Sequence, residues 1–433
     1  MKVKIWWLHP VWYVLGTSCL IIIALVTSDE MYYSAWGTPK WIDFDTAIMS
    51  ISTLLMFTLG LLLALGIKTR KKPQWLLFNP DKFLIIVARV LLILILIGYS
   101  AWFYAAYSRG FSISLAEGVL KGEKGIIYSL KQEYFRTIPG LTSLVQFGPC
   151  YIVLAVYIGV RQGWAKVCKG LLIVLGLTIL RAFFFSERLA LIELFIPGLV
   201  VYVRLLTNRP KWVSLLPLGI VAIVIGLFSS FEYFRSWVNA YTFYMDSYGE
   251  FVYQRLIGYY LTAINNGILL TKSIPDGLDL PYFTFEWFWR FPVLKQIFSY
   301  TDIANVDISE LYDSLLFLYA NPEFNNPSGI LLPIVDFGIF GGLFVWVLLG
   351  FITGILYKWF TEGSIFGLFI YPIWFIGLLE LPRILYWTSS RSFPTFIALL
   401  VVLFLLTVGR QKATFSTRDN SKMINKSNAN LYA

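Results

Sequence analysis

Residues 170–203 form an apolar stretch with four ionisable side chains near its middle: Arg181, Glu187, Arg188 and Glu193. As one helix this stretch would be roughly 51 Å long, whereas the hydrocarbon core of a membrane is about 30 Å thick. Two short helices that turn back at residues 186–188 remove this mismatch. We therefore predict a hairpin that places a carboxylate and a guanidinium together at one membrane face.

Charged side chains at membrane depth cost several kcal/mol unless they are paired or hydrated, which makes these four candidate functional residues. We expect Glu187 to pair with the adjacent Arg188, which would keep the carboxylate ionised. We expect Glu193 to pair with Arg181. An ionised Glu187 beside a bound sugar would orient or deprotonate a hydroxyl; the alternative is that it only neutralises Arg188 or Arg181.

The composition indicates a membrane protein over its whole length. Hydrophobic residues make up 58% of the chain and charged residues 14%, with a mean hydropathy of +0.70, whereas a soluble domain has about 25% charged residues. The predicted fold class is therefore all-α, a polytopic integral membrane protein with about ten transmembrane helices. The ten apolar windows are 11–27, 46–67, 83–108, 138–160, 170–185, 189–203, 212–231, 329–357, 365–382 and 393–409.

Alternating charge in the connections predicts the orientation. Basic residues occur at the N-terminus, at 68–72 and in every second connection after that, and the positive-inside rule assigns these segments and both termini to the cytoplasm. The largest connection is predicted to be an extracytoplasmic loop of short amphipathic helices. The predicted division is a bundle of seven spans at 1–231, the loop at 232–328, three further spans at 329–409 and a disordered cytoplasmic tail at 410–433.

Several kinds of chemistry are excluded by what the sequence lacks. The one histidine, His9, is predicted at the cytoplasmic end of the first span. The chain has no HExxH, P-loop or G-x-S-x-G motif and no metal-ligand spacing among its three cysteines. We therefore predict no metal and no cofactor. The net charge of +10 is dispersed among the spans, which favours contact with anionic lipid over nucleic acid.

The outward half carries arginine far more often than lysine. Arginine offers a planar fork of donors that suits phosphate, and it stays charged when desolvated. The alternative is that each arginine pairs with a carboxylate such as Glu133, Glu187, Glu232 or Glu286, or extends to the interface. The arginines are Arg136, Arg181, Arg188, Arg235, Arg255, Arg290, Arg383 and Arg391. Asp336, in the eighth predicted span, is expected to face the bundle interior as a polar contact or a packing device.

Three patches of the sequence are similar to a known family. They are residues 136–144 with an "IPGLT" entry to a span, residues 181–197 with the order SER-x-A-x-x-E, and Asn325-Asn326-Pro327-Ser328-Gly329 with Asp336 and Gly338. Together with ten spans and a large outer loop before the last helices, the chain resembles the bacterial oligosaccharide repeat unit polymerases, the Wzy-type O-antigen polymerase family. It departs from the related ligases, which use an outer-loop histidine that is missing here.

The resemblance implies a glycosyltransferase in the bacterial plasma membrane that joins polyprenyl-diphosphate-linked oligosaccharides at the outer face. Its implied partners are this lipid-linked substrate, the bilayer, a chain-length regulator and a flippase, with no nucleic acid. Glu187 and Arg188 are the candidate catalytic residues. The candidate ligands of the diphosphate or sugar are Arg181, Arg136, Arg235, Arg255, Arg383, Arg391, Asn325 and Asn326.

Two other functions remain open at this stage. A transporter or flippase for a lipid-linked or anionic saccharide would use the same charged residues to line a route across the membrane. A ligase would attach finished polymer to an acceptor. The charged residues gather toward one predicted face and no repeated half is evident, which favours the polymerase over the transporter.

Overall fold

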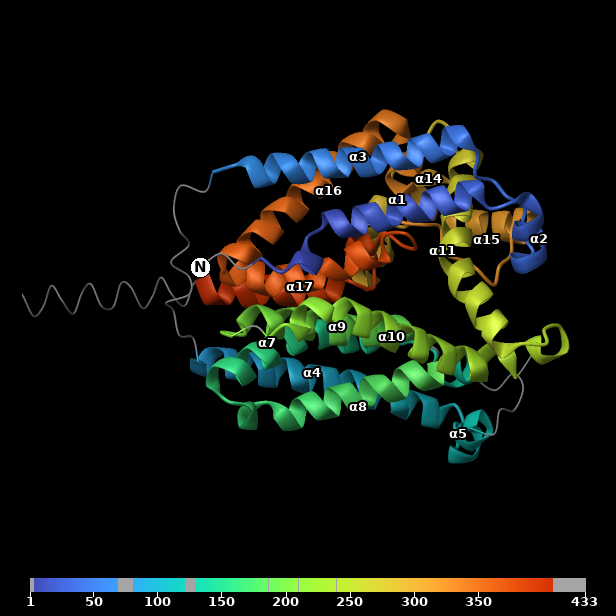
Figure 1. Ribbon diagram of the computed structural model, residues 1–433. Coiled ribbons are helices and arrows are strands. Elements are labelled where there is room, and N and C mark those ends of the chain that lie inside the picture. The colour runs from blue at the N-terminus through green and yellow to red at the C-terminus, as the bar shows by residue number, and fades with distance from the viewer. Residues whose placement is uncertain are drawn as a thin grey trace, which may run out of the picture.

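The computed structural model describes residues 4–68, 81–120, 129–185, 187–208, 210–238 and 240–407. Within these ranges the regular elements are helices and no strand occurs, which confirms the predicted all-α class. Most of the long helices lie side by side and run along a common direction, whereas α11 (Tyr248–Ser273) crosses one end of them (Figure 1).

Five helices of the described part are long and apolar enough to cross a membrane: α3 (Phe44–Gly66), α4 (Asp81–Ser108), η4 (Thr142–Phe147) continued by α7 (Gly148–Gln162), α10 (Trp212–Glu232) and α16 (Leu332–Glu362). The count is six if α1 (Val11–Val26) and α2 (Asp29–Trp36), bent by 100°, form one broken span. Helices also occupy the other predicted windows, and two of these, α17 (Ile365–Glu380) and Phe393–Thr407, are shorter apolar helices. The chain is therefore a membrane protein, and the number ten stays a prediction.

The predicted hairpin at residues 170–203 is confirmed. Helix α8 (Cys168–Phe185) and helix α9 (Arg188–Leu205) pack against each other, and the chain reverses between them. The amide of Glu187 closes the end of α8 by donating to the Ala182 carbonyl at 3.1 Å. Helix α9 begins at Arg188, one residue before the predicted window 189–203.

Helices α3 and α16 make the closest helix pair of the bundle, because glycines let their backbones touch. A methyl group on Gly60 would meet the Val347 carbonyl, and one on Gly350 would meet the Phe57 carbonyl. The contacting pairs rise together along both helices, so α3 and α16 run in the same direction. Without a hydrophobic force between helices in lipid, such close small-residue contacts are a main source of association.

Replacing Gly350 with leucine is therefore expected to separate α3 from α16. The added side chain meets backbone, which cannot rotate away, so we expect a loss of about 3 kcal/mol in the free energy of unfolding. The matched control is Gly219→Leu on α10, where an added Cβ meets nothing within 4 Å. Thermal unfolding of both variants in detergent measures the difference, and equal melting temperatures would contradict this packing.

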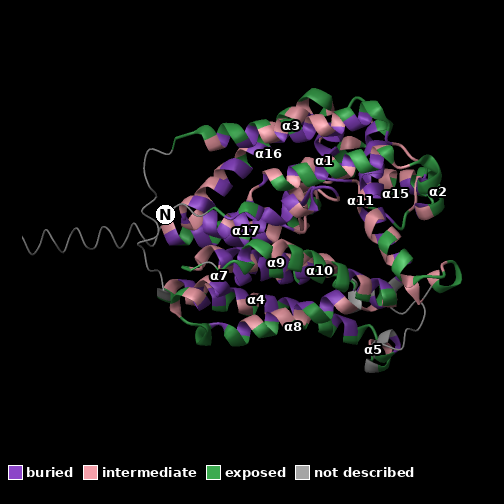
Figure 2. Ribbon diagram, viewed as in Figure 1, coloured by how far each residue is buried: buried purple, intermediate pink, exposed green. Residues whose placement is uncertain are grey.

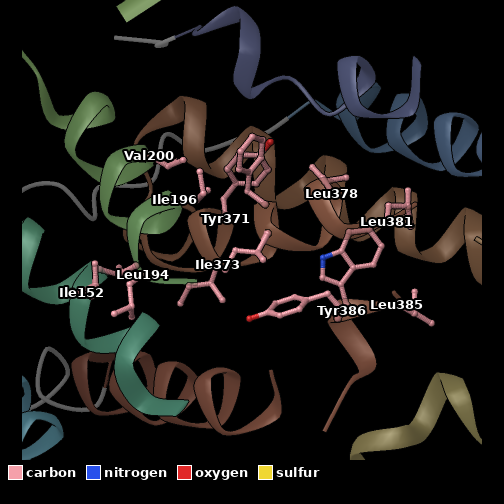
Figure 3. Packing of buried hydrophobic residues seen from close by; sticks show 14 of the residues in the cluster. Ile152, Leu194, Ile196, Val200, Tyr371, Ile373, Leu378, Leu381, Leu385 and Tyr386 are labelled. Atoms are coloured by element: carbon pink, nitrogen blue, oxygen red, sulfur yellow. The ribbon is translucent and has the colours of Figure 1, made fainter. Parts of the chain in front are cut away.

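The most buried part of the bundle lies between α7, α9 and α17. Tyr371, Ile373 and Tyr386 are almost inaccessible and pack with Leu194 of α9 and Ile152 of α7 (Figure 3). In contrast, α3 and α8 expose long stretches of their outer faces (Figure 2). The short helical turn η9 (Tyr386–Thr388) therefore packs directly against this core.

The segment predicted as the outer loop folds into α11 and a series of short helices. These are η6 (Tyr233–Trp237), η7 (Tyr241–Phe243), η8 (Phe283–Phe285), α12 (Glu286–Arg290), α13 (Pro292–Ile297), α14 (Tyr300–Ala304) and α15 (Ile308–Tyr319). The N-terminal segment lies at the opposite end of the bundle from α11, α2 and α5 (Ile113–Leu120) (Figure 1). The structure thus separates the predicted inner and outer ends, and which end faces the cytoplasm stays a prediction.

Asp336 ties this outer segment to the bundle. Its carboxylate is buried and accepts hydrogen bonds from the backbone amides of Tyr282, Phe283 and Thr284, at 2.9 Å, 3.0 Å and 2.5 Å. Two residues later α16 breaks at Gly338, whose φ of 67° and ψ of −179° suit glycine almost alone. Asp336 is therefore an anchor for the outer segment and not a contact within the charged site described below.

Candidate functional site

The hairpin turn joins a first group of charged side chains, the Glu187 cluster. Glu187 accepts two hydrogen bonds from Arg181, the one from Nε at 2.8 Å, and its Oε2 lies 3.7 Å from Nη1 of Arg391. Arg391 also donates two parallel hydrogen bonds of 2.8 Å to Glu193. The Tyr386 hydroxyl donates to the same carboxylate at 3.0 Å. The cluster therefore links α8, α9 and the turn before the last helix.

A second group, the Tyr259 cluster, forms around one aromatic ring of α11. The guanidinium carbons of Arg188, Arg383 and Arg255 lie 4.9 Å, 5.5 Å and 5.6 Å from the centre of the Tyr259 ring. Nη2 of Arg188 also donates to the Tyr259 hydroxyl at 2.9 Å. The electron-rich face of an aromatic ring attracts cations, and this attraction offsets part of the repulsion among the three guanidinium groups.

Carboxylates at the rim of the Tyr259 cluster offset its positive charge. Glu232, at the end of α10, is fully buried and accepts from Arg188 at 2.7 Å and from Arg255 at 3.3 Å. Arg255 also donates to Glu323 at 2.5 Å. Arg383 pairs with Glu380 of the preceding turn at 2.8 Å.

One donor of this cluster lacks a partner. Nε of Arg383 is buried and donates to no acceptor among the described residues. Leaving such a donor unsatisfied costs about 1–3 kcal/mol, and more for a charged group. The guanidinium of Arg383 lies against the same Tyr259 ring as that of Arg188. An anion bound beside Nε of Arg383 would accept the hydrogen bond that this donor lacks.

The two clusters lie at one end of the bundle because most of their residues lie near helix ends, and α11, which carries Tyr259 and Arg255, crosses that end (Figure 1). Arg181 is in the last turn but one of α8, Arg188 starts α9, and Glu232 ends α10. Glu380 ends α17, and Arg383 and Arg391 follow it. Long charged side chains at helix ends reach the aqueous boundary, which lowers their cost in a membrane.

Two predicted ion pairs are wrong. Arg188 pairs with Glu232 and not with its neighbour Glu187, and Arg181 pairs with Glu187 and not with Glu193. Adjacent residues at the beginning of a helix project in different directions, so their side chains rarely form an ion pair with each other. The alternative considered for the arginines, pairing with a carboxylate, holds for all five that gather here.

The structure brings together Arg181, Glu187, Arg188, Arg255, Arg383 and Arg391 of the predicted site residues. Arg136 is exposed, and its backbone carbonyl accepts from Arg109 at 2.9 Å. Asn325 and Asn326 are held through their backbone carbonyls, which accept from Tyr312 and Asn266. The side chain of Arg235, in η6, is outside the described residues, as is the tail 410–433.

Sequence reasoning missed three members of the site and gave Glu286 only a pairing role. Glu323, Glu380 and Tyr386 lie in segments without a charge pattern of their own. Glu286 of α12 accepts from the Ser390 hydroxyl at 3.1 Å and pairs with Arg290 at 3.2 Å. Ser390 precedes Arg391, so this carboxylate lies beside the turn that carries the Glu187 cluster. Burial raises the pKa of the Glu286 carboxyl above its ordinary value of 4.5.

The raised pKa of Glu286 predicts a pH dependence of stability. The folded protein binds this proton more readily than the unfolded chain, so stability falls as the pH rises from 4.5 through the folded pKa and is level above it. Glu286→Gln, which mimics the protonated carboxyl, is expected to gain in melting temperature relative to the wild type across that window. A difference between the two proteins that does not change with pH would contradict the assignment.

The described residues contain no group of three or more His, Cys, Asp or Glu side chains arranged to hold a metal ion. In comparisons with known proteins, no family, no curated protein and no solved structure matches this chain.

Proposed function

We propose that the protein is a polysaccharide polymerase of the bacterial plasma membrane. It transfers a growing oligosaccharide from one polyprenyl diphosphate to the non-reducing end of another lipid-linked repeat unit at the outer face. The product is a surface polysaccharide such as an O-antigen, a capsule or an exopolysaccharide. Its resemblance to the Wzy-type polymerases, in the three sequence patches and in the large outer segment, gives this reaction its substrate class.

The observation that carries the proposal is the gathering of Arg188, Arg255 and Arg383 on the Tyr259 ring, with the buried Nε of Arg383 unsatisfied. Guanidinium groups fixed in advance stabilise negative charge as it develops, without reorganising during the reaction. Their carboxylate partners keep the site neutral until an anion binds. A diphosphate then takes over part of the hydrogen bonding that Glu232, Glu323 and Glu380 provide.

The reaction needs no cofactor, because the diphosphate is already a leaving group. A sugar hydroxyl of the acceptor forms a bond to the anomeric carbon of the donor, and the bond from that carbon to the diphosphate oxygen breaks. The electron pair leaves with the diphosphate, where Arg188 and Arg383 stabilise it. Glu187, between Arg181 and Arg391, accepts a hydrogen bond from the attacking hydroxyl and orients it, and the proton passes to a carboxylate or to water.

The position of the charges favours a polymerase over a transporter. A transporter for an anionic saccharide needs polar groups through the depth of the membrane. The arginines and glutamates of both clusters lie at one end of their helices instead. This placement fits a reaction at a membrane face.

Deletion of the gene in its host tests the function against the alternatives. A polymerase predicts that the surface carries single repeat units without longer chains. Complete loss of surface repeats would indicate a flippase, and lipid-linked polymer that is made but not attached would indicate a ligase. Either of these results would overturn the proposal.

A further inference from the structure

A cavity of about 80 Å³ lies beside the Glu187 cluster, between α4, α8 and the chain that follows α4. Its walls are almost entirely aromatic and aliphatic. They include Trp102 and Phe103 of α4, Phe111 and Phe135 of the following chain, and Leu180 and Arg181 of α8. Among the described residues, Arg181 is the one cation of this wall.

The outer side of the cavity meets the membrane. Phe103 and Leu180 are 42% and 48% exposed. Phe103 lies on α4, which is long and apolar enough to cross a membrane, and Leu180 lies on α8, which is apolar in sequence. Exposed large apolar side chains on such a helix are in contact with hydrocarbon, not with water. An apolar chain from the surrounding bilayer can therefore enter between Phe103 and Leu180 without leaving an apolar environment.

The inner side of the cavity meets the charged site. The Arg181 guanidinium is only 7% exposed, and its carbon lies 5.1 Å from the centre of the Trp102 ring. On its other side Arg181 donates to Glu187, which in turn faces Arg391 at 3.7 Å. A hydrocarbon chain inside the cavity would thus have its polar end at the Glu187 cluster.

We propose that this cavity holds the isoprenoid chain of the lipid-linked substrate next to its diphosphate. The inference rests on the proposed function and adds the place where the lipid part binds. An apolar cavity of about 150 Å³ holds one benzene molecule, so this one takes a single methyl-branched segment of a chain and not the sugar. Aromatic walls suit the unsaturated units of an isoprenoid, and Arg181 matches the charge of the phosphate that follows them.

Photo-crosslinking of the full-length protein in lipid nanodiscs tests this site. The probe is geranylgeranyl diphosphate with a diazirine in its first isoprene unit. We expect the label on residues 99–103 of α4 and on Leu180, removed by excess unlabelled polyprenyl phosphate. Leu180→Trp, which fills the cavity, is expected to reduce labelling at least tenfold. The matched control is Leu172→Trp, which is two turns earlier on the same helix, 62% exposed and outside the cavity, and should label like the wild type.

The outcomes separate this inference from the function. Equal labelling by a diazirine-bearing phosphatidic acid would show that any lipid chain enters this cavity, and it would overturn the isoprenoid assignment. If the same sample forms polymer but the label lies elsewhere, the cavity is not the lipid site, and the proposed polymerase function stands. If the label lies in the cavity but no polymer forms, the lipid site stands and the proposed polymerase function is overturned. Mapping on the wild-type protein needs no variant, so a misfolded Leu180→Trp protein does not prevent the test.

Discussion

A protein in which Arg188 is replaced by alanine is expected to extend lipid-linked chains at least about 100-fold more slowly than the wild type. Removing one pre-positioned donor to developing charge typically has this effect. Arg188 holds that position because Nη2 is fixed by Glu232 and by the Tyr259 hydroxyl. Chain extension by purified protein, measured with lipid-linked repeat units, gives the rate.

The structure also shows how this variant can mislead. Glu232 is fully buried, and Arg188→Ala removes the closer of the two arginines that pair with it among the described side chains. Breaking a buried ion pair by removing one partner costs up to about 3–5 kcal/mol, and less where a second partner such as Arg255 stays in place, so the variant can lose activity through unfolding alone. The double variant Arg188→Ala, Glu232→Gln removes that charge as well. We expect it to regain melting temperature and to stay inactive, and recovery of chain extension in the double variant would exclude Arg188 from the mechanism.

The second large effect is expected for Glu187→Gln. A glutamine keeps the size and one acceptor but loses the negative charge, so it orients the attacking hydroxyl poorly. We expect kcat to fall about 100-fold. KM for the lipid-linked donor should not rise, because a negative charge is removed beside the diphosphate. Steady-state kinetics on reconstituted protein separate the two constants.

A role of Glu187 in structure alone makes a different prediction. Glu187 neutralises Arg181, which is buried, so its loss can act by leaving that cation unpaired. The double variant Arg181→Gln, Glu187→Gln restores the balance of charge. If Glu187 serves only as a counter-ion, the kcat of this double variant is close to that of the wild type, even where the loss of Arg181 raises KM for the donor. Our account expects it to remain slow.

The hairpin was predictable from sequence because it follows from length. Residues 170–203 are too long for one crossing, and their charged residues are at the middle. The break at Gly338 has a similar physical basis, since the eighth predicted span is long and rich in glycine. Arguments of this kind need only the thickness of a membrane and the rise of a helix.

The pairing of the charges was not predictable, because it depends on which helices meet. Glu232 and Arg188 are neighbours only through the packing of α10, α9 and α11, and Arg391 reaches Glu193 from the far end of the chain. Tyr259 is nearly buried, yet it carries three guanidinium groups on its ring. Periodicity places a residue on a helix face, but it does not identify the partner of that face.

Our proposal is that the arginines of the Tyr259 cluster hold a lipid diphosphate while a sugar chain is transferred from it. Its most direct test uses the purified protein in vesicles with a polyprenyl-diphosphate-linked repeat unit and no other enzyme. Our account predicts a ladder of lipid-linked chains, with one polyprenyl diphosphate released for each new glycosidic bond. Substrate that stays at one repeat unit and only crosses the bilayer would contradict it.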